Sequence, residues 1–162
     1  MPRRFGRSLV NHDGNGITMK MQTTAADLFG DTVYIYTRAQ GLADGVLVDV
    51  SSAAREAGIV WPMAMSAAAW ADCVEWTSAD DKRKATLQDE AGRLWDVVWM
   101  ASRAIRGALR RGHDDSTPIR FQLYRVPREG RGIRPRLVEL NLIVGPGDHG
   151  EPTITVLQPG ED

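Results

Sequence analysis

The residues with the clearest chemistry are arginines gathered in the C-terminal half of the chain. Five of them lie in residues 125–136, namely Arg125, Arg128, Arg131, Arg134 and Arg136. Arginine binds phosphates and carboxylates through charge and paired hydrogen bonds. Gly130, Gly132 and Pro135 fall in the same segment, which is typical of a long connection between two strands. We therefore predict a flexible basic loop as the binding surface. The alternative is a solvated hairpin tip whose charge prevents aggregation at a sheet edge.

A second set of arginines lies on a predicted helix over residues 92–112. Arg103, Arg106 and Arg110 recur at steps of three and four. On the other side, apolar residues repeat with the period of a buried helix face: Leu94, Val98, Ala101, Ile105 and Leu109. Trp95 and Trp99 widen this face, so we expect both in the core. The pattern predicts a central core helix with a basic back, and these three arginines join the candidate binding residues.

The charges are unevenly distributed along the chain. Residues 93–136 hold eleven arginines and four acids, a local net charge of +7, although the whole chain has a formal charge of −1. Residues 43–91 hold nine acids and four bases, a local net charge of −5. A GC-rich genome accounts for arginine in place of lysine but not for this clustering. The pattern indicates a basic surface that faces nucleic acid or an acidic protein.

Other residue types give no catalytic or metal-binding pattern. His12, His113 and His149 lie in predicted loops without the spacing of metal ligands. Cys73 lies on the inward side of a predicted helix over residues 67–76, where we expect a buried structural thiol. The Gly145–Gly150 segment matches the residue pattern of a dinucleotide-binding motif, G-x-G-x-x-G. That motif must lead from a strand into a helix, whereas this segment connects two predicted strands, so we interpret it as a turn. We predict no catalytic residue, metal or cofactor.

The length of 162 residues suits one domain with an ordinary globular composition. No apolar run approaches the ~20 residues of a membrane-spanning helix. The N-terminus is basic like the start of a signal peptide, but the apolar segment that a signal peptide needs does not follow it. We therefore expect a cytoplasmic protein without a membrane partner. Residues 1–30 show no sustained hydrophobic periodicity, which predicts a mobile arm. A single domain over residues 31–162 is expected to follow it.

The predicted elements are short helices and strands followed by three C-terminal strands. Helices are expected over residues 38–44, 52–57, 67–76 and 92–112, and residues 77–83 are expected to form a linker or loop. Strands are expected over residues 33–36, 46–50, 119–126, 137–144 and 153–157, and the last three alternate apolar and polar residues. The predicted fold class is α+β, with helices packed on one face of a small antiparallel sheet that ends in a three-stranded meander.

Four segments together resemble a family of small proteins of unknown function carried by bacterial plasmids, integrative elements and phages. They are residues 36–51, 53–58, 92–100 and 144–152, and the resemblance covers residues 33–162. No family residue has an established role to transfer to this chain. The resemblance implies a context, because such genes often serve the transfer or maintenance of the element or its escape from host defence.

From these observations we predict a non-enzymatic accessory protein of a mobile genetic element that binds a macromolecule. The sharpest form is an inhibitor of a host defence complex, of anti-CRISPR or anti-restriction type. Its partner would be a host protein or ribonucleoprotein complex, with nucleic acid as a second partner for the arginines. The alternative is a small enzyme acting on nucleic acid or nucleotides. Should the arginines have no role, the acidic residues Asp72, Glu75, Asp80 and Asp81 are the next candidate surface.

Overall fold

The computed structural model describes residues 36–114 and 117–161 of the chain. The predicted arm and residues 33–35 of the first predicted strand lie outside the described residues. Tyr36, the last residue of that prediction, is not part of a strand. The chain from Tyr36 to Asp162 forms one compact unit.

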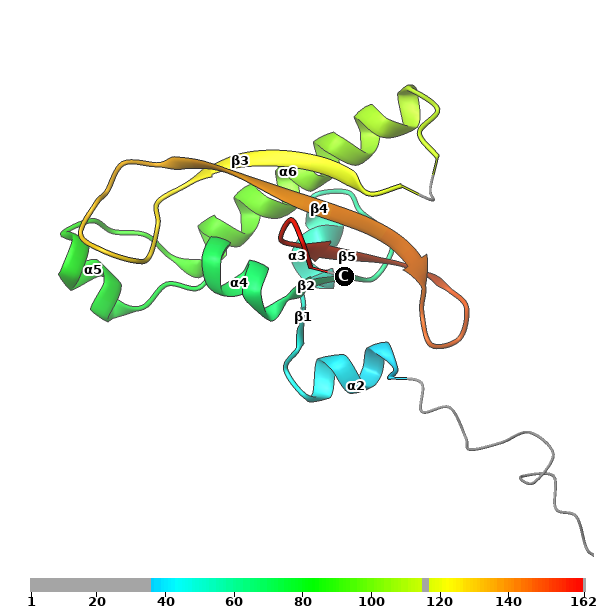
Figure 1. Cartoon of the computed structure of the whole chain (residues 1–162), viewed down its shortest axis with the longest axis horizontal. Coiled ribbons are helices and arrows are strands. Elements are labelled where there is room, and N and C mark those ends of the chain that lie inside the picture. The colour runs from blue at the N-terminus through cyan, green and yellow to red at the C-terminus, as the bar shows by residue number, and fades with distance from the viewer. Residues whose placement is uncertain (1–35, 115–116, 162) are drawn as a thin grey trace, which may run out of the picture. The chain divides into compact units, whose positions relative to one another are not determined.

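The unit contains a five-stranded sheet in the order β1-β2-β5-β4-β3 (Figure 1). The strands are β1 (Leu47–Asp49), β2 (Met63–Ser66), β3 (Ile119–Arg125), β4 (Arg136–Pro146) and β5 (Pro152–Leu157). The predicted C-terminal antiparallel meander is confirmed as β3-β4-β5, and β2 adds to β5 in parallel. The sheet is therefore mixed and larger than predicted. Sequence patterns missed β2 because all of its residues are buried and it shows no alternation.

Alternation along the C-terminal strands sets the face that meets the core. Phe121 pairs with Leu140 in the register of β3 and β4, and both side chains are buried. Leu142 and Val156 pair one strand further along and are fully buried. Because side chains alternate with period two, the intervening Arg120, Gln122 and Tyr124 fall on the opposite face and are exposed.

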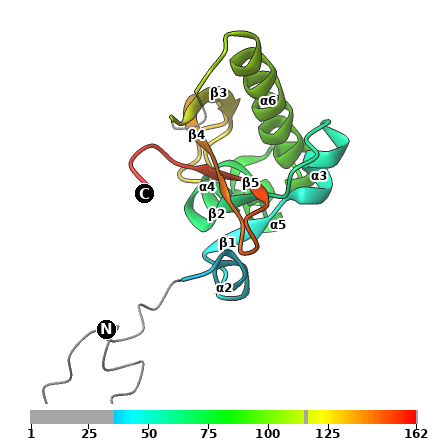
Figure 2. The ribbon, with the colours of Figure 1, turned by 90° about the vertical axis from the view of Figure 1, so that its right-hand side faces the viewer.

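The described residues form five helices, which confirms an α+β fold. They are α2 (Arg38–Ala43), α3 (Ser51–Glu56), α4 (Ala67–Cys73), α5 (Ser78–Lys84) and α6 (Glu90–Arg110). Side chains of α3, α4 and α6 share one core with the strands, and Figure 2 shows α3 and α6 on the same side of the sheet. No helix among the described residues is long and apolar enough to cross a bilayer.

Local capping explains most of the helix starts and one missed helix. Thr37 caps α2 through a capping box, and the Ser66 hydroxyl accepts from the backbone N–H of Ala69 at the start of α4. The predicted linker at residues 77–83 is wrong, because Thr77 and Asp80 form a capping box that begins α5. Val50 occupies the N-cap position of α3, and Ser51 is already helical.

The long helix α6 is confirmed, but its buried face is rotated relative to the prediction. The buried apolar residues are Val97, Val98, Ala101 and Ala108, whereas Trp95 and Trp99 are 40% and 42% exposed. At 100° per residue, the tryptophans lie about half a turn from the centre of this face. Prediction of both tryptophans in the core was therefore wrong. Trp70 packs partly against the core, Trp76 is buried, and Trp61 is exposed.

The glycine-rich segment 145–150 serves as the connection between β4 and β5, as interpreted from the sequence. The backbone N–H of Gly147 donates to the carbonyl of Glu151. The Asp148 carboxylate accepts from the backbone N–H groups of Arg38 and Ala39 at 2.7 and 2.8 Å. This contact attaches α2 to the turn, and it gives the acidic residue of the segment a structural role.

Candidate functional site

The arginine-rich connection between β3 and β4 lies against α5 and does not project as a flexible finger (Figure 1). The ammonium group of Lys84 donates to the carbonyls of Glu129 and Gly132 at 3.0 and 2.9 Å. The guanidinium of Arg83 donates to the carbonyl of Arg128 at 2.7 Å. Two cations of α5 therefore hold the backbone of the predicted loop.

Arg128 is held by carboxylates from the acidic half of the chain. Its Nη1 lies 2.6 Å from Glu75 Oε2, and its Nε donates to Asp80 Oδ2 at 3.2 Å. Asp80 is 1% exposed and also pairs with Arg83. Burial alone would raise the pKa of Asp80, but hydrogen bonds from Thr77 and the charges of Arg128 and Arg83 outweigh it and lower this pKa to about 2. Arg128 is therefore a structural residue of this region.

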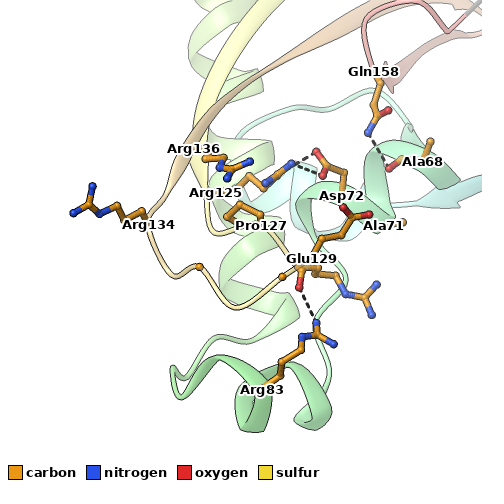
Figure 3. Close-up of a pocket in the computed structure, with 13 residues that line it drawn as sticks. Ala68, Ala71, Asp72, Arg83, Arg125, Pro127, Glu129, Arg134, Arg136 and Gln158 are labelled. Atoms are coloured by element: carbon orange, nitrogen blue, oxygen red, sulfur yellow. Dashed lines mark hydrogen bonds and ion pairs between the residues drawn. The ribbon is translucent and has the colours of Figure 1, made fainter.

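Arg125 combines an ion pair with an unused hydrogen-bond donor. Its Nε donates to Asp72 Oδ2 at 3.1 Å and its Nη2 contacts Asp72 Oδ1, which is a bidentate arrangement (Figure 3). Its Nη1 is buried and has no hydrogen-bond partner among the described residues. A buried charged donor without a partner is costly, so such a group is a natural place for an anionic acceptor.

The remaining arginines of the segment are exposed. No ion pair is formed by Arg131, Arg134 or Arg136 within residues 36–114 and 117–161. Arg136 lies beside Arg125, whereas Arg134 extends outward from the connection (Figure 3). These are the predicted binding residues whose charge stays available to a partner.

Arg125, Arg134 and Arg136 line a cavity of about 950 Å³ between α4 and the connection. Arg83 and Arg128 complete its basic wall, and the acids that line it are Asp72 and Glu129. We call it the arginine cavity. Positive charge exceeds negative charge along its lining, and a partly enclosed site strengthens the field of each charge.

Lys84 shows how strong the basic field is beside this cavity. Its side chain is buried, and burial followed by the charge of Arg83 lowers its pKa, with the nearby Asp80 opposing the shift. Arg136 and Arg125 lower the same pKa further. A cation destabilised by neighbouring cations indicates a region that favours an added negative charge.

The three predicted arginines of α6 do not join the arginine cavity. The Arg106 guanidinium contacts the carbonyl of Ala57 at 3.4 Å, at the end of α3. Arg103 and Arg110 line a different hollow on the side of α6 that faces β3. The structure therefore does not bring the eight predicted binding arginines together: Arg103 and Arg110 line one hollow, and Arg106 lies apart from it beside the end of α3.

Arg93 is an important residue whose structural role the sequence reasoning missed. Its side chain is buried at the start of α6, where Nε donates to the carbonyl of Val74 at 3.0 Å and Nη1 donates to the carbonyl of Val126 at 3.1 Å. Further bonds reach Gln88 Oε1 and the carbonyl of Asp72. Burial lowers the pKa of Arg93. Its position on the flank of the apolar face of α6 was the available signal.

The candidate histidines and cysteine lie outside the arginine cavity. Cys73 is buried as predicted, and burial followed by the charge of Asp72 raises the pKa of its thiol to about 12. The His113 ring contacts Thr117, and His149 is exposed in the β4–β5 turn. His12 lies outside the described residues. Within the described part of the chain, no group of three His, Cys, Asp or Glu side chains is placed to hold a metal ion.

A comparison of the sequence with known protein families identifies the family of this chain. Residues 24–162 match the family of unknown function DUF6573, and the chain belongs to that family. Neither a curated protein nor a solved structure matches the chain.

Proposed function

We propose that the protein is a binding protein that holds an anionic macromolecule at the arginine cavity. The observation that carries the proposal is the buried Nη1 of Arg125, which has no hydrogen-bond partner among the described residues. Arg125 lines the cavity together with Arg134 and Arg136, which form no ion pair in the same part of the chain. A phosphate or carboxylate oxygen accepts from such a donor and satisfies it. Arg134 and Arg136 then add charge around the same anion.

The most specific test changes the guanidinium of Arg125, which carries the buried donor. Arg125→Lys keeps the charge and an ion pair with Asp72 but removes the fork of the guanidinium. Fluorescence anisotropy would measure binding of a labelled duplex DNA of about 20 base pairs as the phosphate source. Labelled polyglutamate would be the carboxylate source. We expect about tenfold weaker binding of the preferred polyanion, the scale of one hydrogen bond to a charged group.

A second variant tests the exposed arginines, with a matched control. Arg134→Gln with Arg136→Gln removes two charges from the lining. Arg55→Gln with Lys82→Gln removes two exposed charges that do not line the cavity. The first pair should lower the salt dependence of DNA binding by about two counterions, because each phosphate contact releases about one. Equal effects of both pairs, or binding of neither polyanion by the parent chain, would refute the proposal.

The finer form of the proposal concerns the partner. An accessory protein of a mobile element, acting in the cytoplasm, would use the arginine cavity to occupy a surface of a host defence complex and so inhibit it. Support for this form comes from the sequence resemblance and from the basic lining, since an inhibitor needs charge complementarity and no catalytic group.

Expression of the chain in cells that carry a restriction or CRISPR system provides the test of this finer form. Phage plating should recover with the parent chain and should not recover with Arg125→Lys. Failure of the parent chain to restore phage plating on such hosts would refute the proposal that it inhibits a defence complex. Binding of a polyanion at the arginine cavity would still be tested by the anisotropy experiments.

A further inference from the structure

A second hollow, separate from the arginine cavity, lies between α6 and β3. Its volume is about 1100 Å³, and residues of α6, β3 and β4 line it. α6 runs alongside β3, which is the last strand of the sheet and has one unpaired edge (Figure 1). We call this surface the α6–β3 groove.

Aromatic side chains stand exposed along this groove. The rings of Trp95 and Trp99 stack with centroids 5.8 Å apart and planes inclined by 24°. Trp99 lines the groove directly, and on the β3 side Tyr124 is 67% exposed. Exposed indole rings of this kind are unusual on a free surface, because large aromatic groups are normally covered by core or by a partner.

Arginines occupy the same groove without carboxylate partners. Arg103 and Arg110 come from α6, Arg111 is the C-cap of this helix, and Arg120 comes from β3. Across the described ranges of the chain, none of the four forms an ion pair. Two carboxylates, Asp96 and Glu139, also line the groove, and Glu139 accepts from the side chain of Gln122. Positive charge is therefore in excess.

The spacing along α6 places stacking groups and cations in one row. Trp95, Trp99, Arg103 and Arg110 follow one another at steps of four, four and seven, which keeps them on one side of a helix. Fifteen residues at 1.5 Å each give this row a length of about 22 Å. Such a length suits the about four nucleotides of the smallest single-strand sites.

We propose that the α6–β3 groove binds single-stranded nucleic acid. Bases stack on the rings of Trp95 and Trp99, and phosphates contact Arg103, Arg110 and Arg111. Any base has a face that can stack, so the site accepts many sequences. A paired duplex keeps its base faces covered, and an acidic peptide offers charge without flat rings, so both leave the tryptophans unused. The inference does not rest on the arginine cavity.

The experiment uses the full chain and a labelled oligothymidine of about 12 nucleotides. Anisotropy should report binding at low salt, and tryptophan fluorescence should be quenched as bases stack. Trp99→Ala should weaken binding about tenfold, as removal of one stacking platform does, and Trp99→Phe should restore part of it. Trp61→Ala is the matched control, because Trp61 is 41% exposed and does not line the groove.

A second pair of variants tests the phosphate contacts. Arg103→Gln with Arg110→Gln should reduce the salt slope by about 1.4, the value for two phosphates of a single strand. The control, Arg55→Gln with Lys82→Gln, should leave the slope of the parent. These variants also keep the test intact if Trp99→Ala fails to fold, which circular dichroism would reveal.

Several outcomes would overturn the inference. They are absence of oligothymidine binding by the parent chain at about 50 mM salt, equal oligothymidine binding by the Trp99 and Trp61 variants, and a loss of duplex DNA or polyglutamate binding in Trp99→Ala as large as its loss of oligothymidine binding. Loss of self-association in Trp99→Ala, seen by sedimentation without an effect on oligothymidine, would assign the tryptophans to an interface between copies of the chain.

Discussion

The arginine cavity and the α6–β3 groove carry the same side chain in opposite settings. At the cavity, Arg125 and Arg128 meet the carboxylates of Asp72, Glu75 and Asp80. At the groove, Arg103 and Arg110 line the same hollow as the exposed Trp99, and no carboxylate pairs with them in the described residues. Both sets come from the basic segment 93–136. The surroundings of an arginine, more than its place in a charge cluster, therefore decide whether it stabilises the fold or stays available to a partner.

The same contrast applies to the tryptophans. Trp76 is 6% exposed, its Nε1 donates to Asp81 at 2.7 Å, and the Arg93 guanidinium lies 4.9 Å from its ring centre. Trp95 and Trp99 instead stack on each other and are both partly exposed to solvent. One region uses aromatic and charged groups to close a core, and the other leaves both exposed.

The largest expected effect compares two tryptophan truncations. Trp76→Ala should lower the free energy of unfolding by about 3–5 kcal/mol, as truncation of a buried large aromatic does. Trp95→Ala should cost about 1 kcal/mol, since the side chain is 40% exposed. Urea denaturation measures both. Equal losses would mean that Trp95 belongs to the core as the sequence suggested, and the comparison between the regions would fail.

The next effect compares two arginines of the same helix. Arg93→Met should cost about 3 kcal/mol, because it leaves the buried carbonyls of Val74 and Val126 without donors. Arg103→Met is the matched control and should stay within about 0.5 kcal/mol of the parent, the usual range for exposed positions. Denaturation of the two variants under identical conditions decides the point. A similar loss in both would place Arg103 in a structural contact.

Local signals in the sequence predicted much of the fold. Thr37, Ser66 and the glycines at positions 45 and 58 mark helix ends through capping and positive φ, and each depends only on neighbouring residues. The start of α5 was missed although Thr77 and Asp80 have the capping-box spacing, because the polar composition of residues 77–83 was interpreted as a linker. The capping-box spacing of Thr77 and Asp80 is therefore a signal in the sequence that predicts α5.

The candidate site was less predictable because its contacts are distant in sequence. Asp72 and Arg125 are 53 residues apart, and Asp80 and Arg128 are 48 residues apart. Segment charges of −5 and +7 predicted two separate surfaces, whereas the fold brings part of each segment together.

The wrong prediction of the buried face of α6 had a different cause. Tryptophan was taken as core by hydrophobicity, and periodicity alone could not decide which of two adjacent stripes was buried.

A smaller effect concerns the pH dependence of stability at the arginine cavity. The pKa of Asp80 is lowered to about 2 in the folded chain, below its ordinary value. Its charge therefore stabilises the fold above about pH 4, and this contribution of about 2 kcal/mol is lost as the pH falls towards 2. Asp80→Asn keeps a side-chain acceptor for the α5 cap but should lack this part of the pH dependence.

Urea denaturation of parent and Asp80→Asn at several acidic pH values gives the comparison. The difference in unfolding free energy should be largest near neutral pH and should shrink as the pH is lowered, because protonation of Asp80 removes the same charge as the substitution. A constant difference across this range would show that the charge of Asp80 is not what holds Arg83 and Arg128.

The smallest expected effect concerns the unpaired arginines of the groove. Arg103, Arg110 and Arg111 repel one another, and this repulsion is screened when salt rises from about 0.05 to about 0.5 M. The parent should therefore gain up to about 0.5 kcal/mol of unfolding free energy relative to a variant in which all three are replaced by Gln. The ion pairs of the arginine cavity are present in both chains, so their own salt response cancels in the difference. If salt shifts both chains equally, the groove arginines are neutralised by contacts within the full chain, and the groove is less open to phosphates than the comparison requires.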